Sequence, residues 1–327
     1  MKKNVLVIGG TGYIGSEVIL ELENNKKYNV VSFSHQINEY CLSYMGDVLN
    51  SSELERVYRE CNIDVTLILY GLKSISNSDD VSSYANNELV GLINILTACE
   101  KYGCKKVVYL SSSSVYDSGI NIQENSPTKI NCFYSYIKQT SEELIKWYKK
   151  KSNIDFVIFR CFNVAGYSNI GKKTKDIVSL ALTNNYLNVF GNTFDTPDGT
   201  LVRDYIHVKD VASAIIKAID FPYSEIFNLG TGKGYSVFSI VERIKEISNK
   251  DINIFISNKR DFDQACLIAD ITKIKKLLDW APKYDLDLII RESYEIIKYL
   301  RIETNNISKQ KLNNSFVRNK LEYANGL

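Results

Sequence analysis

Residues 5–16 read Val-Leu-Val-Ile-Gly-Gly-Thr-Gly-Tyr-Ile-Gly-Ser, in which a short apolar run leads directly into a glycine-rich turn. The run is typical of a buried strand, and Ile14, Val18 and Leu22 then share one face of a helix. A strand, a turn and a helix in this order can point backbone N–H groups at the phosphates of a nucleotide. The sequence therefore predicts a nucleotide-binding start, with an ordinary tight strand-to-helix connection as the alternative.

A physical reason explains why glycine is needed at each of three spaced positions. Gly9 can adopt a positive φ, Gly12 leaves space for a phosphate beside the backbone, and Gly15 lets the helix pack closely on the strand. Their spacing is G-x-x-G-x-x-G, one residue different from the commoner dinucleotide fingerprint. Because such a turn alone is weak evidence, the interpretation depends on residues further along the chain.

The composition excludes several classes of partner. The chain has 327 residues, of which 45% are hydrophobic, so it can bury a sizeable core. Lys and Arg number 40 against 38 Asp and Glu, and the charges are interspersed, so no basic field would attract nucleic acid or a lipid surface. We therefore expect a globular protein that binds small molecules, without nucleic acid and without a membrane.

The first residues and the cysteines indicate a cytoplasmic protein. Residues 1–4 lead directly into the first strand, which leaves no room for a signal peptide, and no apolar run reaches the length of a membrane span. The seven cysteines lack C-x-x-C spacing and the chain has only two histidines, so we expect no zinc or other metal site.

Expected strands alternate with expected helices along most of the chain. The strands are 5–8, 28–33, 64–69, 105–110, 154–159 and 226–229, and the helices that follow them include 53–61, 81–101, 209–221 and 237–248. This alternation predicts an α/β fold of Rossmann type, a doubly wound parallel sheet with its ligands at the carboxyl ends of the strands.

The domain organisation follows from where this pattern loosens. We expect an NAD(P)-binding Rossmann domain at 1–165, with returning segments at about 205–230, and a smaller C-terminal α/β substrate-binding domain at 166–301. Residues 302–327 are polar and weakly periodic, so we interpret them as a C-terminal extension.

Polar residues stand at the expected strand ends, where a cofactor would lie. After the second strand, a dinucleotide site that prefers NAD uses an acidic residue, but here Ser34, His35 and Gln36 occupy the loop, which leaves NAD or NADP open. Asp47 lies where a carboxylate could accept a hydrogen bond from an adenine amino group. It equally suits the N-terminal cap region of the next helix.

The chemistry-bearing residues are Ser112, Tyr134 and Lys138. Tyr134 and Lys138 are four apart on an expected helix, so the phenol and the ammonium lie on one side, and the lysine charge favours the phenolate form needed for a general base. Ser112 follows the strand 105–110 and could hydrogen-bond the same reacting oxygen. Each residue alone has an ordinary structural explanation, but together with the glycine turn they form a catalytic pattern.

The pattern resembles the extended short-chain dehydrogenase/reductases, and among them the UDP-glucose 4-epimerase branch of the nucleotide-sugar epimerases. The similarity covers about residues 3–290, and its matching segments are 9–16, 71–73, 111–112, 115–116, Tyr134 with Lys138, 160–163 and 195–208. The last segment, Asp-Thr-Pro-Asp-Gly-Thr-Leu-Val-Arg-Asp-Tyr-Ile-His-Val, is the most specific one. It favours a 4-epimerase over a dehydratase, which would also need an acid and a base where Ser113 and Ser114 stand.

The resemblance implies a role for each matching residue. Catalysis would fall to Ser112, Tyr134 and Lys138. The residues implied around NAD are Gly9, Gly12, Tyr13, Ile14, Gly15, Asp47, Lys73, Tyr134 and Lys138. Those implied around a nucleotide-diphosphate sugar are Lys73, Ser112, Asn163, Phe190, Arg203, Arg260 and Asp263. Two arginines suit a pyrophosphate and Phe190 offers a face for a base. For Arg203 the alternative is a salt bridge with Asp204 or another carboxylate.

The chain also departs from the family pattern at several positions. Ser34 stands where the acidic residue is expected, Tyr70 ends a segment that is His-Phe-Ala in the family, Glu88 replaces an asparagine ahead of Gly91, and Asp117 replaces a glycine. Two rival functions follow. One is an NADPH-dependent nucleotide-4-keto-sugar reductase, and the other is a non-catalytic nucleotide-binding homologue.

The resemblance further implies a homodimer that pairs through helices 81–101 and 134–150.

Overall fold

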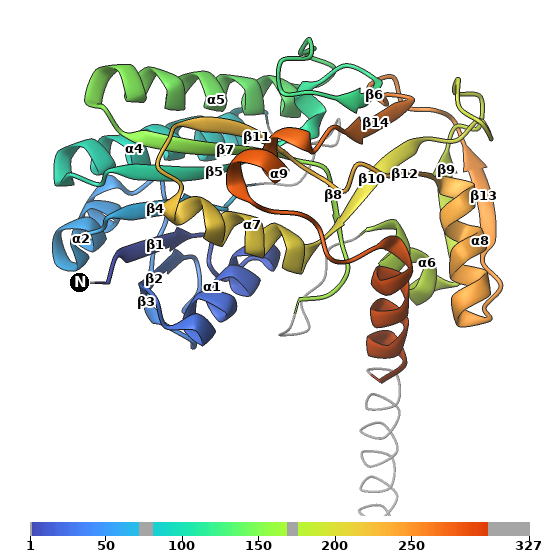
Figure 1. The fold of residues 1–327 in the computed structure, drawn as a ribbon, viewed down its shortest axis with the longest axis horizontal. Coiled ribbons are helices and arrows are strands. Elements are labelled where there is room, and N and C mark those ends of the chain that lie inside the picture. The colour runs from blue at the N-terminus through green and yellow to red at the C-terminus, as the bar shows by residue number, and fades with distance from the viewer. Residues whose placement is uncertain (1, 72–80, 169–175, 300–327) are drawn as a thin grey trace, which may run out of the picture.

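The computed structural model describes residues 2–71, 81–168 and 176–299. Its main sheet has seven parallel strands in the order β3-β2-β1-β4-β5-β7-β11 (Figure 1). In chain order they are β1 (Asn4–Ile8), β2 (Asn29–Ser34), β3 (Leu42–Met45), β4 (Val65–Ile68), β5 (Lys106–Ser112), β7 (Asp155–Cys161) and β11 (Glu225–Leu229). The predicted doubly wound parallel sheet is confirmed.

Helices cover both faces of this sheet, because its strands present buried apolar side chains on both faces. On one face, α1 (Tyr13–Asn25) and α7 (Val208–Asp220) bury Val18, Ile19, Val211 and Ile215 in one hydrophobic core. On the other face, α2 (Ser51–Cys61), α4 (Gly91–Tyr102) and α5 (Phe133–Ser152) pack in a second core (Figure 1). The chain order reverses at β1, between β2 and β4, which is where a doubly wound sheet opens a crevice for ligands.

A second, mixed sheet lies beside the main one. Its strands are β6 (Gly119–Ile122), β10 (Val202–His207), β12 (Gly234–Ser236) and β14 (Cys266–Ala269), and β8 (Asn163–Ala165) pairs with β10. A parallel pair, β9 (Tyr186–Phe190) and β13 (Asn253–Ser257), packs near α6 (Ile177–Asn184) and α8 (Val237–Ser248). The predicted domain limits stay predictions. Two strands of this second sheet, β6 and β8, come from residues 1–165, the range predicted for the Rossmann domain. Residues 302–327 lie outside the described part of the chain.

The expected helix 81–101 is interrupted in the structure. It consists of α3 (Val81–Ala85), a π-helical turn η1 (Asn86–Val90) and α4, and the backbone N–H of Gly91 bonds the carbonyl of Asn86 five residues back. Heptad-like spacing alone does not reveal a π-turn, because one extra residue leaves the apolar pattern on either side intact. The short elements η2 (Ser113–Val115) and α9 (Thr272–Leu278) and a helix over 286–299 complete the fold.

Among the described residues, no helix combines the length and the apolar character that a bilayer crossing needs.

His207 joins the end of β10 to α7 and the helix over 286–299. Its Nδ1 accepts the backbone N–H of Lys209 at 3.0 Å, so the ring proton sits on Nε2, which lies 3.1 Å from a carboxylate oxygen of Glu292. The ring is fully buried and stacks on Tyr284 at 4.5 Å. Burial lowers the pKa of His207 to about 4, because the charged form would lose its hydration, and Glu292 only partly opposes this effect.

We expect this neutral histidine to make stability depend on pH. Its pKa is lower in the folded chain than in the unfolded chain, so protons favour unfolding, and stability is lost as the pH falls from about 6.5 towards 4. Between about pH 7.5 and about pH 5 the loss from this group is about 2 kcal/mol. His207→Asn keeps an acceptor for Lys209 without titrating. Urea unfolding at the two pH values measures the difference, and equal losses in both proteins would contradict the assignment.

Candidate functional site

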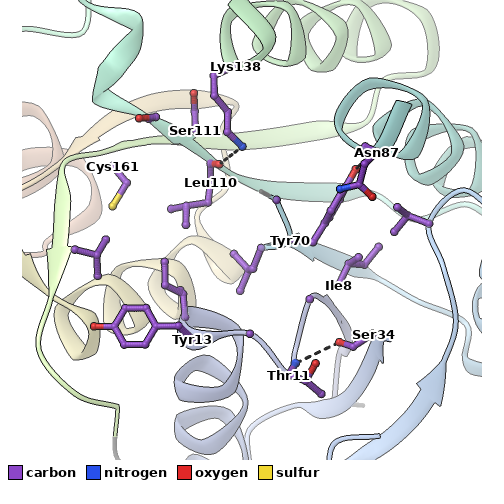
Figure 2. Close-up of a pocket in the computed structure, with 18 of the residues that line it drawn as sticks. Ile8, Thr11, Tyr13, Ser34, Tyr70, Asn87, Leu110, Ser111, Lys138 and Cys161 are labelled. Carbon is purple, nitrogen blue, oxygen red and sulfur yellow. Dashed lines mark hydrogen bonds between the residues drawn. The ribbon is translucent and has the colours of Figure 1, made fainter. Parts of the chain in front are cut away.

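A cavity of about 640 Å³ opens at the carboxyl ends of the parallel strands. It is lined by the β1–α1 turn, the ends of β2, β4 and β5, the start of α5 and the strand β8 (Figure 2). This position at the β1–β4 reversal is where doubly wound folds bind their ligands. The cavity brings together most of the residues that the sequence predicted for the cofactor, together with all three predicted catalytic residues.

The glycine turn has the geometry that the sequence predicted. Gly9 has a φ of +84°, and a Cβ there would lie 2.8 Å from the backbone nitrogen of Tyr70. A Cβ on Gly15 would lie 2.2 Å from the carbonyl oxygen of Gly9, so α1 can pack this closely only on glycine. Gly12 is the N-cap of α1, and no described side chain caps that end. The exposed N–H groups and the bare backbone fit a pyrophosphate.

The three residues that follow the turn, Tyr13, Ile14 and Gly15, differ in what they contact. The ring of Tyr13 lines the cavity, while its hydroxyl donates to the carbonyl of Gly166 at 2.7 Å and so fastens the segment after β8 to α1. Burial raises the pKa of this phenol well above its usual range, so it stays a donor. Ile14 also lines the cavity, whereas Gly15 is buried against the turn.

Ser34 at the end of β2 stands where the sequence lacks the expected acidic residue, and two predicted cofactor residues, Asp47 and Lys73, remain to be placed. Ser34 lines the cavity and its Oγ accepts the backbone N–H of Thr11 at 3.2 Å, so it braces the glycine turn (Figure 2). Asp47 accepts the N–H of Leu49 at 2.9 Å, and the N-cap of α2 is Asn50. Asp47 is therefore not the N-cap itself but lies in the cap region, where its backbone N–H donates to Glu53 of α2 at 3.1 Å, and its role towards adenine stays a prediction. Lys73 lies outside the described residues.

The three predicted catalytic residues meet at one wall of the cavity. Ser112 ends β5, and its Oγ accepts the backbone N–H of Ser114 at 3.2 Å, which fixes the side chain at the strand end. Tyr134 lies in the first turn of α5, and the Nζ atom of Lys138 lies 5.8 Å from the centre of the Tyr134 ring. The i,i+4 spacing thus places the ammonium beside the phenol, as predicted.

Lys138 is held by partners that the sequence did not reveal. Its Nζ lies 3.3 Å from a carboxylate oxygen of Glu88 and 3.1 Å from the hydroxyl of Tyr109. It also lies 3.5 Å from the carbonyl of Leu110, the contact drawn in Figure 2. Burial alone lowers the pKa of Lys138, but Tyr109, Glu88 and Tyr134 raise it, and the net pKa lies well above its usual value. Lys138 is therefore a permanent cation. Tyr109 was not predicted, and Glu88 was noted only as a departure from the family pattern and not as a partner of Lys138, because both approach from distant segments.

A buried ion pair supports this wall from behind. Glu142, on α5, accepts the hydroxyl of Ser111 at 2.6 Å and pairs with the guanidinium of Arg160 at 2.7 Å. The network joins α5, β5 and β7, so it fixes the distance between Ser112 and the start of α5. Glu142 lies two turns after Tyr134 on the same helix, which is the only signal that its sequence position offers.

The residues predicted for the nucleotide form a second group. The guanidinium of Arg260 lies 4.7 Å from the centre of the Phe190 ring and pairs with the carboxylate of Asp263 at 2.8 Å. Phe190 ends β9 and remains 39% exposed, so a base can still reach it. The cation already covers one face of that ring. These three residues do not line the large cavity, whereas Asn163 does.

Arg203 lies on β10, and it forms no salt bridge with the neighbouring Asp204. Its guanidinium donates to the carbonyl of Val202 at 2.9 Å, while the carboxylate of Asp204 accepts from the backbone of Thr231 and Gly232 at 2.8 Å. The salt bridge with Asp204 is therefore wrong as an alternative, because successive side chains on a strand point to opposite faces. Burial lowers the pKa of Arg203.

Comparison with known proteins agrees with this geometry. The family model described as "NAD dependent epimerase/dehydratase family" matches residues 5–230. A UDP-glucose 4-epimerase of Lactobacillus helveticus is 32% identical over 306 residues, covering 86% of this chain and 92% of the relative. A UDP-glucose 4-epimerase of Bifidobacterium longum, solved in complex with NAD+ and UDP, is 30% identical and superimposes with a TM-score of 0.83, covering 91% and 98% of the two chains.

A further solved structure is named for two sugars. The UDP-Glc/GlcNAc 4-epimerase of Campylobacter jejuni is 26% identical, with a TM-score of 0.78, and covers 91% of this chain and 99% of its own.

Proposed function

The chain belongs to the NAD dependent epimerase/dehydratase family, and from this premise we propose that it is a nucleotide-sugar 4-epimerase with tightly bound NAD. The substrate would be UDP-glucose and UDP-galactose or the N-acetylated analogues. The similar protein of Lactobacillus helveticus is named for UDP-glucose and that of Campylobacter jejuni for UDP-Glc and UDP-GlcNAc, and inversion at C4 relates each of these sugars to its galactose form. One observation carries the proposal: Ser112, Tyr134 and Lys138 line the same cavity as the glycine turn.

NAD fits the glycine turn on steric and electrostatic grounds. Gly9 and Gly12 leave the backbone bare, and the uncapped N-terminus of α1 offers N–H groups to a pyrophosphate. Ser34 lines the cavity at the end of β2, and Asp47 follows β3 next to the lining residue Gly46. These two residues would meet the adenosine half, although the loop after β2 lacks the acidic residue that usually accepts from the ribose. When bound, NAD would supply reversible hydride transfer at the sugar carbon C4.

The chain's own residues would move the proton and hold the sugar. Tyr134, as phenolate, would take the proton of the 4-hydroxyl and return it after the sugar has turned over. The Lys138 ammonium favours that phenolate, and Ser112 would hold the reacting oxygen in line by a hydrogen bond. The buried Glu142–Arg160 pair keeps the two sides of this arrangement in register.

The residues predicted around the nucleotide would anchor it. Arg203 and Arg260 are suited to the two phosphates, and Phe190 can stack on the base beside the Arg260 guanidinium. Anchoring at the nucleotide leaves the hexose free to turn, which a 4-epimerase requires. We also propose that the protein is a homodimer, since Ile93 on α4 and Tyr136 and Trp147 on α5 are exposed apolar residues on two neighbouring helices.

The purified protein should release NAD on denaturation, detected by mass spectrometry. It should also interconvert UDP-glucose and UDP-galactose, or their N-acetylated analogues, without net change in absorbance at the nicotinamide wavelength. No change is expected because the cofactor is regenerated in each turnover. A sustained loss of NADPH absorbance with a 4-keto sugar would instead identify the reductase alternative, which the missing acidic residue after β2 favours. Bound NAD without turnover of any sugar would point to a non-catalytic homologue.

A further inference from the structure

Glu88 lies in the one π-helical turn of the described chain, and the cavity wall is built around that turn. The hydroxyl of Tyr70 lies 3.2 Å from the carbonyl of Asn87 and 3.4 Å from the carbonyl of Glu88, so it satisfies backbone groups that the π-turn displaces. A Cβ on Gly91 would lie 2.8 Å from that hydroxyl, so the glycine makes the contact possible. π-turns of this kind often occur at functional sites.

The turn delivers the Glu88 carboxylate to Lys138. Glu88 is 3% exposed and Lys138 is 4% exposed, and the two charges are 3.3 Å apart. A Cβ on Gly71, which lines the cavity, would lie 2.9 Å from Glu88 Oε1, so the carboxylate stands directly behind the cavity wall. Burying a carboxylate costs several kcal/mol unless a cation compensates it, and among the described residues Lys138 supplies such a cation.

We propose that Glu88 is a positioning residue that acts through Lys138: its carboxylate holds the ammonium between Tyr109 and Tyr134 and offsets part of the positive charge that the Tyr134 hydroxyl experiences. The proposal rests on the proposed function and deepens it. It assigns to this chain a way of setting the pH at which its general base becomes active.

The other titratable groups around this pair do not replace Glu88. Tyr70, Tyr84 and Tyr109 face it from the end of β4, from α3 and from β5, and burial raises the pKa of each phenol, so all three stay neutral. Among the described residues, Asp47 is the other carboxylate near Tyr70, and its own contact is with the backbone of Leu49. Within the described part of the chain, Glu88 is therefore the anion that compensates Lys138.

Glu88→Gln keeps the shape of the side chain and removes its charge. The uncompensated Lys138 ammonium should then stabilise the Tyr134 phenolate further, and the acidic limb of the kcat/KM profile should move to lower pH by about one unit. Glu88→Asp, which keeps the charge, should stay close to the wild type. If Glu88→Gln does not fold, Tyr70→Phe, which removes the hydroxyl that holds the π-turn, should give a smaller shift in the same direction.

A second readout needs no turnover. Phenolate absorbance is titrated in the full-length protein and in Glu88→Gln, each with and without Tyr134→Phe, and the difference isolates one phenol among the 22 tyrosines. The same downward shift is expected. If the wild type epimerises no sugar but this shift appears, the proposed function fails and the role of Glu88 stands.

Asp210→Asn is the matched control. Asp210 is a buried carboxylate that accepts from the backbone of Lys283 and Tyr284, none of which lines the cavity. Its neutralisation should cost stability and leave both pH readouts unchanged. An unshifted acidic limb and an unshifted phenol titration in folded Glu88→Gln would overturn the proposal, because Glu88 would then be merely structural.

Discussion

Tyr134→Phe is expected to lower kcat for epimerisation by about 10²- to 10⁴-fold, the range over which a general acid–base group contributes. The substitution removes one oxygen from a side chain that lines the cavity next to Ser112 and Lys138. The ring is only half-buried and stays in place, so the melting temperature and the NAD content should change little. Turnover of the nucleotide sugar, measured at saturating substrate, is the test.

Tyr136→Phe is the matched control for this experiment. Tyr136 lies two residues later on the same helix and is 45% exposed, away from the Lys138 side. Its variant should keep the wild-type kcat. If Tyr134→Phe turned over every sugar as fast as the wild type, the enzymatic interpretation of the cavity would be wrong, and only a nucleotide-binding protein would remain.

Gly9→Ala is expected to abolish NAD retention and to destabilise the fold by about 3 kcal/mol or more. The residue has a φ of +84°, which an L side chain adopts only at a cost, and its Cβ would lie 2.8 Å from the backbone nitrogen of Tyr70. That neighbour is main chain and cannot rotate away. The β1–α1 turn must therefore shift, and with it the N–H groups offered to the pyrophosphate.

Gly103→Ala is the matched control, which separates the backbone strain of a positive φ from the steric clash with Tyr70. Gly103 has a φ of +74°, close to that of Gly9, but no atom lies within 4 Å of its added Cβ. It should cost about 1–2 kcal/mol and leave NAD bound. Urea unfolding and the NAD content of both variants, measured side by side, give the comparison. Equal losses would show that the approach of Tyr70 to the turn is unimportant.

Local patterns predicted much of the architecture. The helix expected at 237–248 is α8 with those bounds, and the expected strands of the main sheet are present within one or two residues at most ends. These elements are long, strongly apolar and closed by turn residues, so local preference and tertiary structure agree. The short strands β3, β6 and β8 were not predicted, since three or four residues carry too little pattern and are held by their partners in the sheet.

The residues of the site likewise fall into those that the sequence predicted and those that only the tertiary structure revealed. The sequence by itself determined the glycine turn and the pairing of Tyr134 with Lys138, because backbone sterics and helical spacing act within a few residues. Only the tertiary structure decided that Glu88, fifty residues before Lys138, becomes its counter-ion, and that Glu142 and Arg160 brace the wall behind Ser112. The cost of burying a charge depends on what the whole fold places around it, and no local pattern records that.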